Sequence, residues 1–271
     1  MKNLFNKRVI GELFIIFLLS LTPLLWFRPG QLMLGHDNVF PLEPKQFLLG
    51  RLSTWVGHAF GQNQSLIMGT IPIHFIDAVP YLLGFSVYTT QKIVYVFWFF
   101  MIGMAMYTLA KTLKKDGWFA VVATIVYQFN FFILQGWWIG EKSKFSAYIA
   151  LPLVLAVFYK VYRKEFSVLT GIAANTLILF FFNGAGLYGV PLFGGFFISL
   201  GVFTILYGFV SLQKSVRDGM RLLLLAAGTL IGSLVANAYY WLPAASAVLS
   251  NYASGIAAQG GVQGLIEWAT E

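Results

Sequence analysis

The chain has 271 residues, of which 58% are hydrophobic, 18% aromatic and 10% charged, and it contains no cysteine. A soluble protein of this composition could not cover its surface with polar groups, so the sequence indicates a membrane protein. The lack of cysteine excludes disulfides, thiolate catalysis and cysteine metal ligands. The net charge of +8 is informative through its distribution along the chain.

Apolar segments long enough to cross a bilayer recur along the whole chain. In lipid, helices are the only open-chain structures that satisfy every backbone group. The first segment is longer than the apolar core of a signal peptide, so we expect a retained span. The segments are residues 9–27, 93–110, 117–135, 146–162, 166–182, 190–210 and 222–243. The predicted fold is an all-α polytopic membrane protein with about seven transmembrane helices.

The connections between these segments differ in charge. With a cytoplasmic N-terminus, every short inner segment is basic, through Lys2, Lys7, Arg8, Lys111, Lys114, Lys115, Lys160, Arg163, Lys164, Lys214, Arg217 and Arg221. The other basic residues are spread over longer outer segments: Arg28, Lys45, Arg51, Lys92, Lys142 and Lys144. The positive-inside rule therefore predicts a multi-pass protein of the cytoplasmic membrane with its N-terminus inside. The basic balance is explained by this topology and does not indicate nucleic-acid binding.

The first outer segment, residues 28–91, is too apolar and too patterned to be a disordered loop. A helix lying in the membrane interface is predicted from Pro41, because apolar residues recur at helical spacing at Leu48, Leu52, Trp55 and Val56. A second such helix is expected from Ile71 to Gly84. The stretch GQNQSLIMGT between them reads as a turn rich in polar residues and glycine.

Acidic residues are scarce, and carboxylates near lipid are costly, so their placement is informative. Pairing with cations explains the acids of the inner segments and Glu12, which lies one turn after Arg8. Apart from the C-terminal tail, the remaining acids and all the histidines lie on the outer side: His36, Asp37, Glu43, His58, His74, Asp77 and Glu141. The histidines lack the spacing of a zinc site.

A reaction on a lipid-linked phosphate would use these outer residues together. Asp37, just after the first span, would take a proton from an acceptor hydroxyl, a contribution of about 10²–10⁴ in rate. Glu141, on the next outer loop, is the second candidate catalytic acid. Substrate and phosphate would be bound by His36, Lys45, Arg51, His74, Asp77, Lys142 and Lys144. The spans would form a wall along which a polyprenyl chain lies.

Each of these residues also has a structural alternative. Asp37 would form a turn before the helix that follows it, and Glu43 would be a first-turn carboxylate favoured by the helix dipole. His74 and Asp77 share a helical face and would form a local ion pair. Glu141 would belong to a solvated charge cluster in an interfacial belt of tryptophans.

The pattern resembles the GT-C class of polytopic glycosyltransferases, in which an acid follows the first span and a long first outer loop carries membrane-parallel helices. Within that class, the runs GHDNVFPLEPKQFLLGRLSTW, FGQNQSLIMGTIPIHFIDAVPYLLG and NAYYWLPA are similar to arabinofuranosyltransferases of the mycobacterial cell-wall type. The resemblance implies inverting transfer of a sugar from a polyprenyl-phosphate donor to a glycan, lipid or protein acceptor on the outer face. Asp37 matches the position of the family's catalytic acid, whereas Glu141 matches in location only.

The sequence also departs from that class. Many metal-using members carry two acids as D-x-D or E-x-D, but Gly35 and His36 precede Asp37 here, so a divalent metal is not indicated. Members usually have further spans and outer-face soluble domains. Residues 1–243 are therefore expected to form the transmembrane core, and residues 244–271 to form an outer-face tail that begins such a domain.

Two other functions remain open. A transporter or flippase for a lipid or small anion would place polar or helix-breaking residues in mid-membrane. The candidates are uncharged, and no internal repeat accompanies them: Gln128, Asn130, Asn175 and Asn183. A non-catalytic assembly partner would keep the same fold without activity. The donor sugar, the acceptor and the length of the lipid are not encoded in any short motif of this sequence.

Overall fold

The computed structural model describes residues 7–33, 40–56, 62–63, 65–114, 117–139, 141–184, 201–202, 204–205, 207–209, 215–246 and 249. Within these ranges the chain is helical, apart from turns and one antiparallel pair of two-residue strands, β1 (Trp55–Val56) and β2 (Gln62–Asn63). The predicted all-α class is confirmed.

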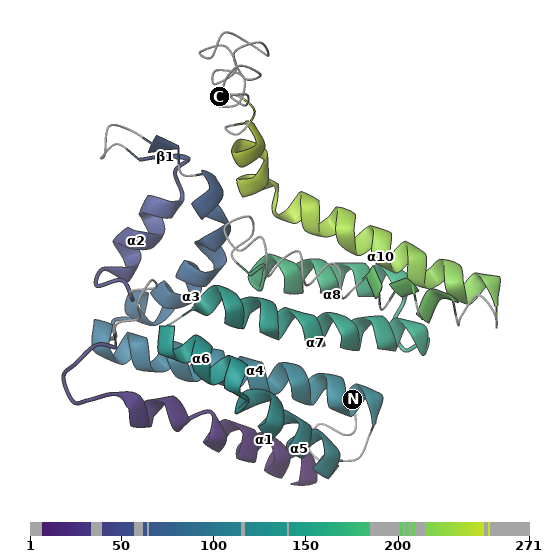
Figure 1. The fold of residues 1–271 in the computed structure, drawn as a ribbon, viewed down its shortest axis with the longest axis horizontal. Helices are drawn as coiled ribbons and strands as arrows, with labels where there is room; N and C mark the ends of the chain where they lie inside the picture. The colour runs from purple at the N-terminus through teal and green to yellow at the C-terminus, as the bar shows by residue number, and fades with distance from the viewer. Residues whose placement is uncertain are drawn as a thin grey trace, which may run out of the picture.

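Long helices lie side by side along the long axis of the molecule (Figure 1). They are α1 (Lys7–Leu19) with the 3-10 helix η1 (Thr22–Trp26), α4 (Val87–Leu113), α5 (Gly117–Gln128), α6 (Phe131–Ile139), α7 (Lys142–Tyr162), α8 (Val168–Phe181) and α10 (Val216–Ala236). A shorter set, which we call the loop-helix layer, covers the left-hand end of this bundle in Figure 1. It consists of α2 (Pro44–Arg51), η2 (Ser65–Thr70) and α3 (Ile71–Leu82).

Among the described residues, four helices are long and apolar enough to cross a membrane: Lys7–Trp26, Val87–Leu113, Lys142–Tyr162 and Val216–Ala236. The pair Trp118–Gln128 and Phe131–Trp137, bent by 47°, gives a fifth if it counts as one span. These helices indicate a multi-pass membrane protein. The predicted number of seven stays a prediction, because α8 has only 14 residues and most of 190–210 lies outside the described ranges.

The bend in the predicted span 117–135 has a local cause at Asn130. Its Oδ1 accepts a hydrogen bond of 3.1 Å from the backbone N–H of Ile133 and so caps the start of α6. Its Nδ2 donates to the carbonyl of Tyr127 and to the hydroxyl of Tyr148, both at 2.7 Å. An asparagine side chain that competes for backbone groups in this way favours a helix end over a helix interior. The single helix predicted for residues 117–135 is therefore divided into α5 and α6.

The basic ends of the long helices gather at the end of the bundle away from the loop-helix layer, which we call the basic end. Lys111, in the last turn of α4, lies 3.0 Å from Glu12 on α1. Lys164, after α7, lies 3.0 Å from Asp218 in the first turn of α10. Basic residues that the sequence analysis assigns to inner segments therefore lie together at one end of the bundle.

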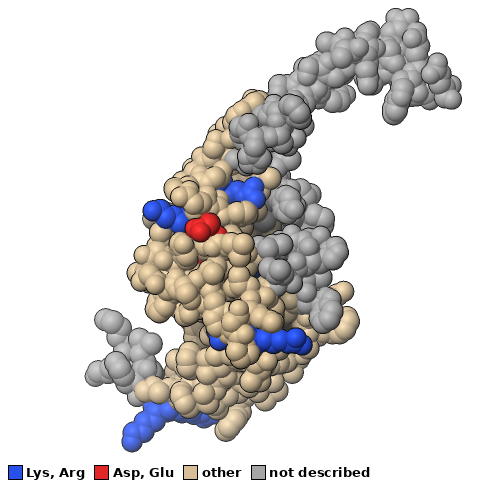
Figure 2. Space-filling view, turned by 90° about the vertical axis from the view of Figure 1, so that its left-hand side faces the viewer, with Lys and Arg blue, Asp and Glu red and all other residues tan. Residues whose placement is uncertain are grey.

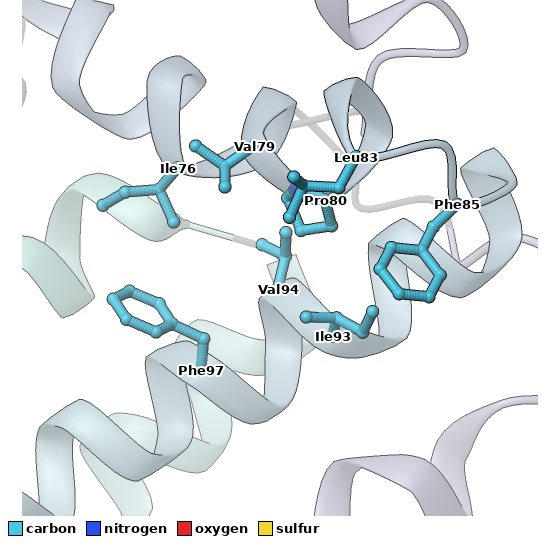
Figure 3. Close-up of a pocket in the computed structure, with 8 residues that line it drawn as sticks. All are labelled: Ile76, Val79, Pro80, Leu83, Phe85, Ile93, Val94 and Phe97. Atoms are coloured by element: carbon cyan, nitrogen blue, oxygen red, sulfur yellow. The ribbon is translucent and has the colours of Figure 1, made fainter.

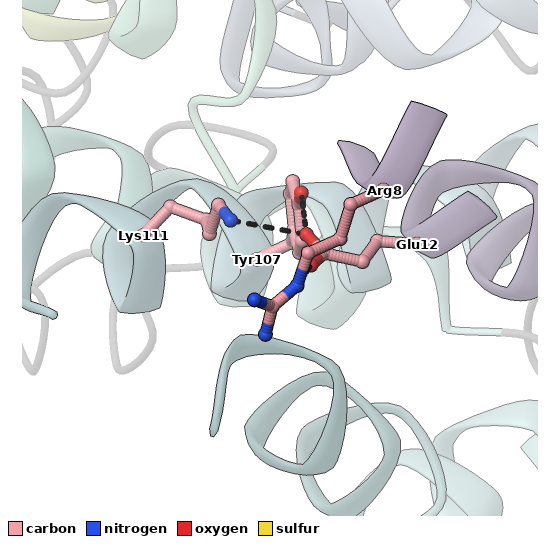
Figure 4. Close-up of polar contacts among 4 residues, drawn as sticks. All are labelled: Arg8, Glu12, Tyr107 and Lys111. Atoms are coloured by element: carbon pink, nitrogen blue, oxygen red, sulfur yellow. Dashed lines mark hydrogen bonds and ion pairs between the residues drawn. The ribbon is translucent and has the colours of Figure 1, made fainter. Parts of the chain in front are cut away.

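Glu12 is the centre of a buried polar group at the basic end (Figure 4). The carboxylate is 6% exposed and accepts hydrogen bonds from the Tyr107 hydroxyl at 2.6 Å and from Lys111 at 3.0 Å. Arg8 lies 3.2 Å from its other oxygen. The predicted pairing of Glu12 with cations is confirmed, and it joins the first span to α4.

The loop-helix layer corrects the sequence prediction in part. The first predicted interface helix ends at Arg51, and Trp55 lies in β1 instead. Ser53 ends the helix by bonding the backbone of Trp55, donating to its carbonyl at 2.8 Å and accepting from its N–H at 3.1 Å. Within the predicted turn GQNQSLIMGT, residues 65–70 form η2. The second predicted helix is present as α3, and a position of either helix in a membrane interface stays a prediction.

Two glycines let α8 and α10 approach closely. A side-chain carbon at Gly228 would overlap Ile172, and one at Gly232 would overlap Thr176. Small residues at such crossings are typical of helix pairs in lipid, where close van der Waals packing replaces the hydrophobic effect. The hydrogen bond of 3.1 Å from Asn175 to Thr229 lies in the same interface.

We expect Gly228→Leu to destabilise the folded chain in detergent by about 1–3 kcal/mol, because it overfills the contact with Ile172. Thermal unfolding of the purified protein measures this effect. The matched control is Gly11→Leu on α1, where a side-chain carbon would meet nothing within 4 Å. Equal melting temperatures for the two variants would contradict the close crossing of α8 and α10.

Candidate functional site

A buried ion pair between Asp77 and Lys142 links the loop-helix layer to the bundle. Asp77 on α3 is fully buried, and Lys142, the first residue of α7, is 6% exposed. The Lys142 ammonium donates to Asp77 Oδ2. The pair joins the first predicted outer segment to the second. Within a largely apolar setting, removal of either partner would leave an uncompensated buried charge.

His74 and two residues of α2 extend this site. His74 lies one turn before Asp77, with its Nδ1 at 3.4 Å from Asp77 Oδ2. The ring of Phe47 packs edge-to-face on His74, with ring centroids 4.7 Å apart. The guanidinium of Arg51 lies 4.6 Å from the centre of the Phe47 ring. The contacts therefore run from α2 through α3 to α7.

The charges of the site are set by burial and by close neighbours. Burial alone would raise the pKa of Asp77, but the positive charge of Lys142 and the contact with His74 hold it below its ordinary value of 3.8. Burial lowers the pKa of His74 below 6.5, and the charges of Lys142 and Arg51 add to this, while Asp77 opposes it. At neutral pH, Asp77 is therefore charged and His74 is neutral.

The described residues on either side of Asp37 contact the bundle. Before it, the buried side chain of Gln91 on α4 accepts from the backbone N–H of Met33 at 2.9 Å and donates to its carbonyl at 2.6 Å. After it, Phe40 is fully buried, and its ring centre lies 4.9 Å from the Lys142 nitrogen. Asp37 itself, like His36 and His58, lies outside the described residues.

Glu141 and Lys144 form a second charged pair at the start of α7. The Lys144 nitrogen lies 3.2 Å from Glu141 Oε2 and 4.8 Å from the centre of the Phe132 ring. The side chain of Glu141 is 27% exposed, so it is open to solvent, whereas Asp77 is not. Nearby Trp137 is 4% exposed and belongs to the core.

The remaining predicted residues lie on α2 and before it. Lys45 is exposed, and Glu43 accepts a hydrogen bond of 3.2 Å from the hydroxyl of Tyr81 on α3. Seen from the end that carries the loop-helix layer, the surface is mostly uncharged, with separated basic groups and little acid (Figure 2). Over the described ranges, no three histidine or acidic side chains gather as metal ligands.

The sequence predicted the local contact between His74 and Asp77, which the structure contains at 3.4 Å. It did not reveal that Lys142 and Arg51 lie at the same site, and substrate binding by these residues stays a prediction. Phe40 and Phe47 were missed, because a lone aromatic residue carries no signal of what it covers. A second contact between the loop-helix layer and the bundle was also missed: Asn183 donates to the carbonyl of Gly69 in η2 at 3.1 Å.

The uncharged polar residues of the spans are used in contacts between helices. Gln128 donates to the Ser20 hydroxyl at 3.0 Å and to the carbonyl of Phe99 at 2.8 Å. Asn183 lies 3.3 Å from Asn237, the first residue of the NAYYWLPA run. Such bonds between helices are typical of membrane bundles and do not by themselves indicate a transport path.

No protein-family model matches the sequence, and neither the curated proteins nor the solved structures contain a match. The resemblance to the GT-C class therefore rests on the residues of this chain alone.

We expect Lys142→Met to destabilise the folded chain by about 3–5 kcal/mol, because Asp77 would stay buried without a cation. The double variant Asp77→Leu with Lys142→Met removes both charges and should recover most of that loss. Thermal unfolding in detergent compares the two. A double variant no more stable than Lys142→Met would contradict the ion pair as the source of the effect.

We expect the stability of the folded chain to depend on pH through His74. Because the pKa of His74 is lower in the folded chain than its ordinary 6.5, the unfolded chain binds more protons between the two values. Stability from this residue is complete above pH 6.5 and is lost as the pH falls through the folded pKa. Melting temperatures measured from about pH 8 to 5 should fall less for His74→Gln than for the wild type. If the melting temperatures of both proteins fell equally with pH, the pKa of His74 would be the same in the folded and unfolded chains.

Proposed function

We propose that this chain is a glycosyltransferase core of the cytoplasmic membrane, with its N-terminus inside and its site at the outer face. It transfers a sugar from a polyprenyl-phosphate donor to a glycan, lipid or protein acceptor. The observation that carries the proposal is the position of the described residues on either side of Asp37. Met33 is bonded to Gln91, and Phe40 lies against Lys142, which is itself paired with Asp77.

The loop-helix layer suits a substrate with a long apolar chain and a charged phosphate. Its exposed side chains include Leu49, Phe75 and Leu82, which would contact lipid. Cations lie on the same end of the bundle at Lys45, Arg51 and Lys144. Lys144 is paired with Glu141 in the structure, and a donor phosphate would take the place of that carboxylate.

The reaction follows from these roles. Asp37 accepts the proton of the acceptor hydroxyl as its oxygen attacks the anomeric carbon of the donor. The bond from that carbon to the phosphate oxygen breaks, and the configuration inverts. Polyprenyl phosphate leaves with the negative charge, which the cations stabilise. Glu141, being partly exposed, is the alternative base, whereas Asp77 is fully buried and paired with Lys142.

The described spans give less support to the transporter. The amide nitrogens of Gln128 and Asn175 donate to neighbouring helices, whereas their buried amide oxygens have no partner among the described residues. Glu12, the buried carboxylate of the first span, is paired at the basic end. Ion-coupled transport would need an ionisable group in mid-membrane, and Gln128 and Asn175 are uncharged.

We expect membranes that carry the wild-type chain to transfer label from at least one of a panel of polyprenyl-phosphate sugars. The Asp37→Asn variant, matched for expression, should be slower by about 10²–10⁴, since it removes a general base. Glu43→Gln is the control, because this acid bonds Tyr81 and has no proposed catalytic role.

The outcomes separate the candidates. Equal transfer by the wild type and Asp37→Asn would assign Asp37 to a turn and move the base to Glu141. Absence of transfer from every donor would favour the transporter or the assembly partner.

A further inference from the structure

A polar cleft follows directly on the first span, beside the beginning of α4. It encloses about 220 Å³, and we call it the turn cleft. Its lining includes a cation and a side-chain amide: Trp26, Phe27, Arg28, Gln31, Leu32 and Met33. The groove between α3 and α4, by contrast, has only apolar walls and so offers no group that selects a ligand (Figure 3).

A tight turn forms the first edge of the turn cleft. The carbonyl of Arg28 accepts the backbone N–H of Gln31 at 3.2 Å. Pro29 and Gly30 suit the central positions of such a turn, because the second position needs the left-handed conformation that Gly30 has, with a φ of 71°. The hydroxyl of Tyr88 donates to the same carbonyl at 3.2 Å and so joins the turn to α4.

The other edge of the turn cleft is bonded to the same helix. The buried side chain of Gln91 accepts from the backbone N–H of Met33 and donates to its carbonyl. Both edges are therefore held by α4 side chains that lie one turn apart. A ligand would meet a cleft whose shape is already set, and little ordering would oppose its binding.

Two cations act on the turn cleft. Arg28 lines it directly. The nitrogen of Lys92 lies 4.1 Å from the centre of the Tyr88 ring and 5.9 Å from that of Phe27, which lines the cleft. The second distance is shorter than the screening length of about 10 Å in 0.1 M salt. Within the described ranges neither cation forms an ion pair with a carboxylate, unlike the lysines at the start of α7.

The turn cleft lies at the level where the helices would leave the hydrocarbon of a bilayer. The first span ends at Trp26, directly before it. On α4, Lys92 precedes Lys111 of the basic end by 19 residues. That separation is about 29 Å at roughly 1.5 Å per residue, close to the hydrocarbon thickness of about 30 Å. The cleft therefore lies at the depth of lipid phosphates.

We propose that the turn cleft binds the phosphate group of a membrane lipid. The guanidinium of Arg28 presents N–H groups in a plane that matches two phosphate oxygens, and the amide of Gln31 is a further donor. Lys92 adds positive charge beside them. Phospholipids and polyprenyl phosphate both carry this group. The inference requires the first span and α4 to cross a bilayer, but it does not require transferase activity.

The absence of cysteine from the chain allows a direct test. Leu32→Cys places one thiol in the turn cleft, and its modification by a maleimide is followed on the full chain in detergent. Added phosphatidylglycerol or polyprenyl phosphate should slow the modification several-fold. Diacylglycerol, which has acyl chains but no phosphate, should not. Slowing by one of the phosphate lipids alone identifies it as the source, and slowing by both identifies the shared group.

Charge variants in the same thiol background test the assigned residues. Arg28→Gln should weaken the protection by phosphatidylglycerol or polyprenyl phosphate about tenfold, since it removes a charge-assisted hydrogen bond. Lys92→Gln should weaken it less. The matched control is Lys114→Gln, which removes one charge from the other end of α4, where Lys114 also lies near an aromatic ring.

Three results would overturn the proposal. Equal weakening by Arg28→Gln and Lys114→Gln would assign the effect to general attraction between charges. Equal slowing by diacylglycerol would show that phosphate is not recognised. Absence of slowing by both phosphate lipids, with or without slowing by inorganic phosphate, would show that no lipid phosphate binds.

A second measurement leaves the residues of the cleft unlabelled. Native mass spectrometry of the purified full chain should find a retained phosphate lipid, which Arg28→Gln should lose and Lys114→Gln should keep. Equal retention by the two variants, at melting temperatures equal to that of the wild type, would overturn the proposal. Neither measurement uses transfer activity, so failure of the proposed function is distinguished from failure of the turn cleft.

Discussion

The buried pair of Asp77 and Lys142 is the interaction on which the arrangement of the loop-helix layer depends. In an apolar setting each charge is costly alone, so α3 and the start of α7 are stable only together. The other contacts of the layer follow from this one. Phe47 places α2 on His74, and Phe40 covers the ammonium of Lys142. On the other side of residues 34–39, Met33 is bonded to Gln91 on α4.

Charge organises the two ends of the bundle, and close packing organises the spans between them. At the basic end, Glu12 joins α1 to α4, as Asp77 joins α3 to α7 at the other. Between these ends, lipid offers no hydrophobic force that drives helices together. The helices are held together instead by close packing at glycines, as at Gly228, and by side-chain amide hydrogen bonds, as at Gln128.

Local patterns were predictable, and distant pairings were not. The lengths of the apolar segments predicted four of the spans, and the helical spacing of apolar residues predicted α3. The basic residues assigned to the inner segments lie together at one end, as expected. The bend at Asn130 was missed, because an asparagine in an apolar run does not reveal whether its side chain caps a new helix. The pairing of Asp77 with Lys142 joins residues 65 apart in sequence, and nothing in either neighbourhood specifies the partner.

The difference in exposure between Asp77 and Glu141 distinguishes a structural role from a catalytic one. Protonation of Asp77 would leave Lys142 as a buried charge without a partner, so a proton taken up there would weaken the contact between α3 and α7. A general base must gain a proton in each cycle and keep the site intact. Asp77 is therefore suited to positioning, and the base of the proposed reaction must be an acid whose charge the fold does not require. Glu141, which is partly exposed and paired with Lys144, meets that condition in the described part of the chain, and Asp37 meets the sequence pattern of the role.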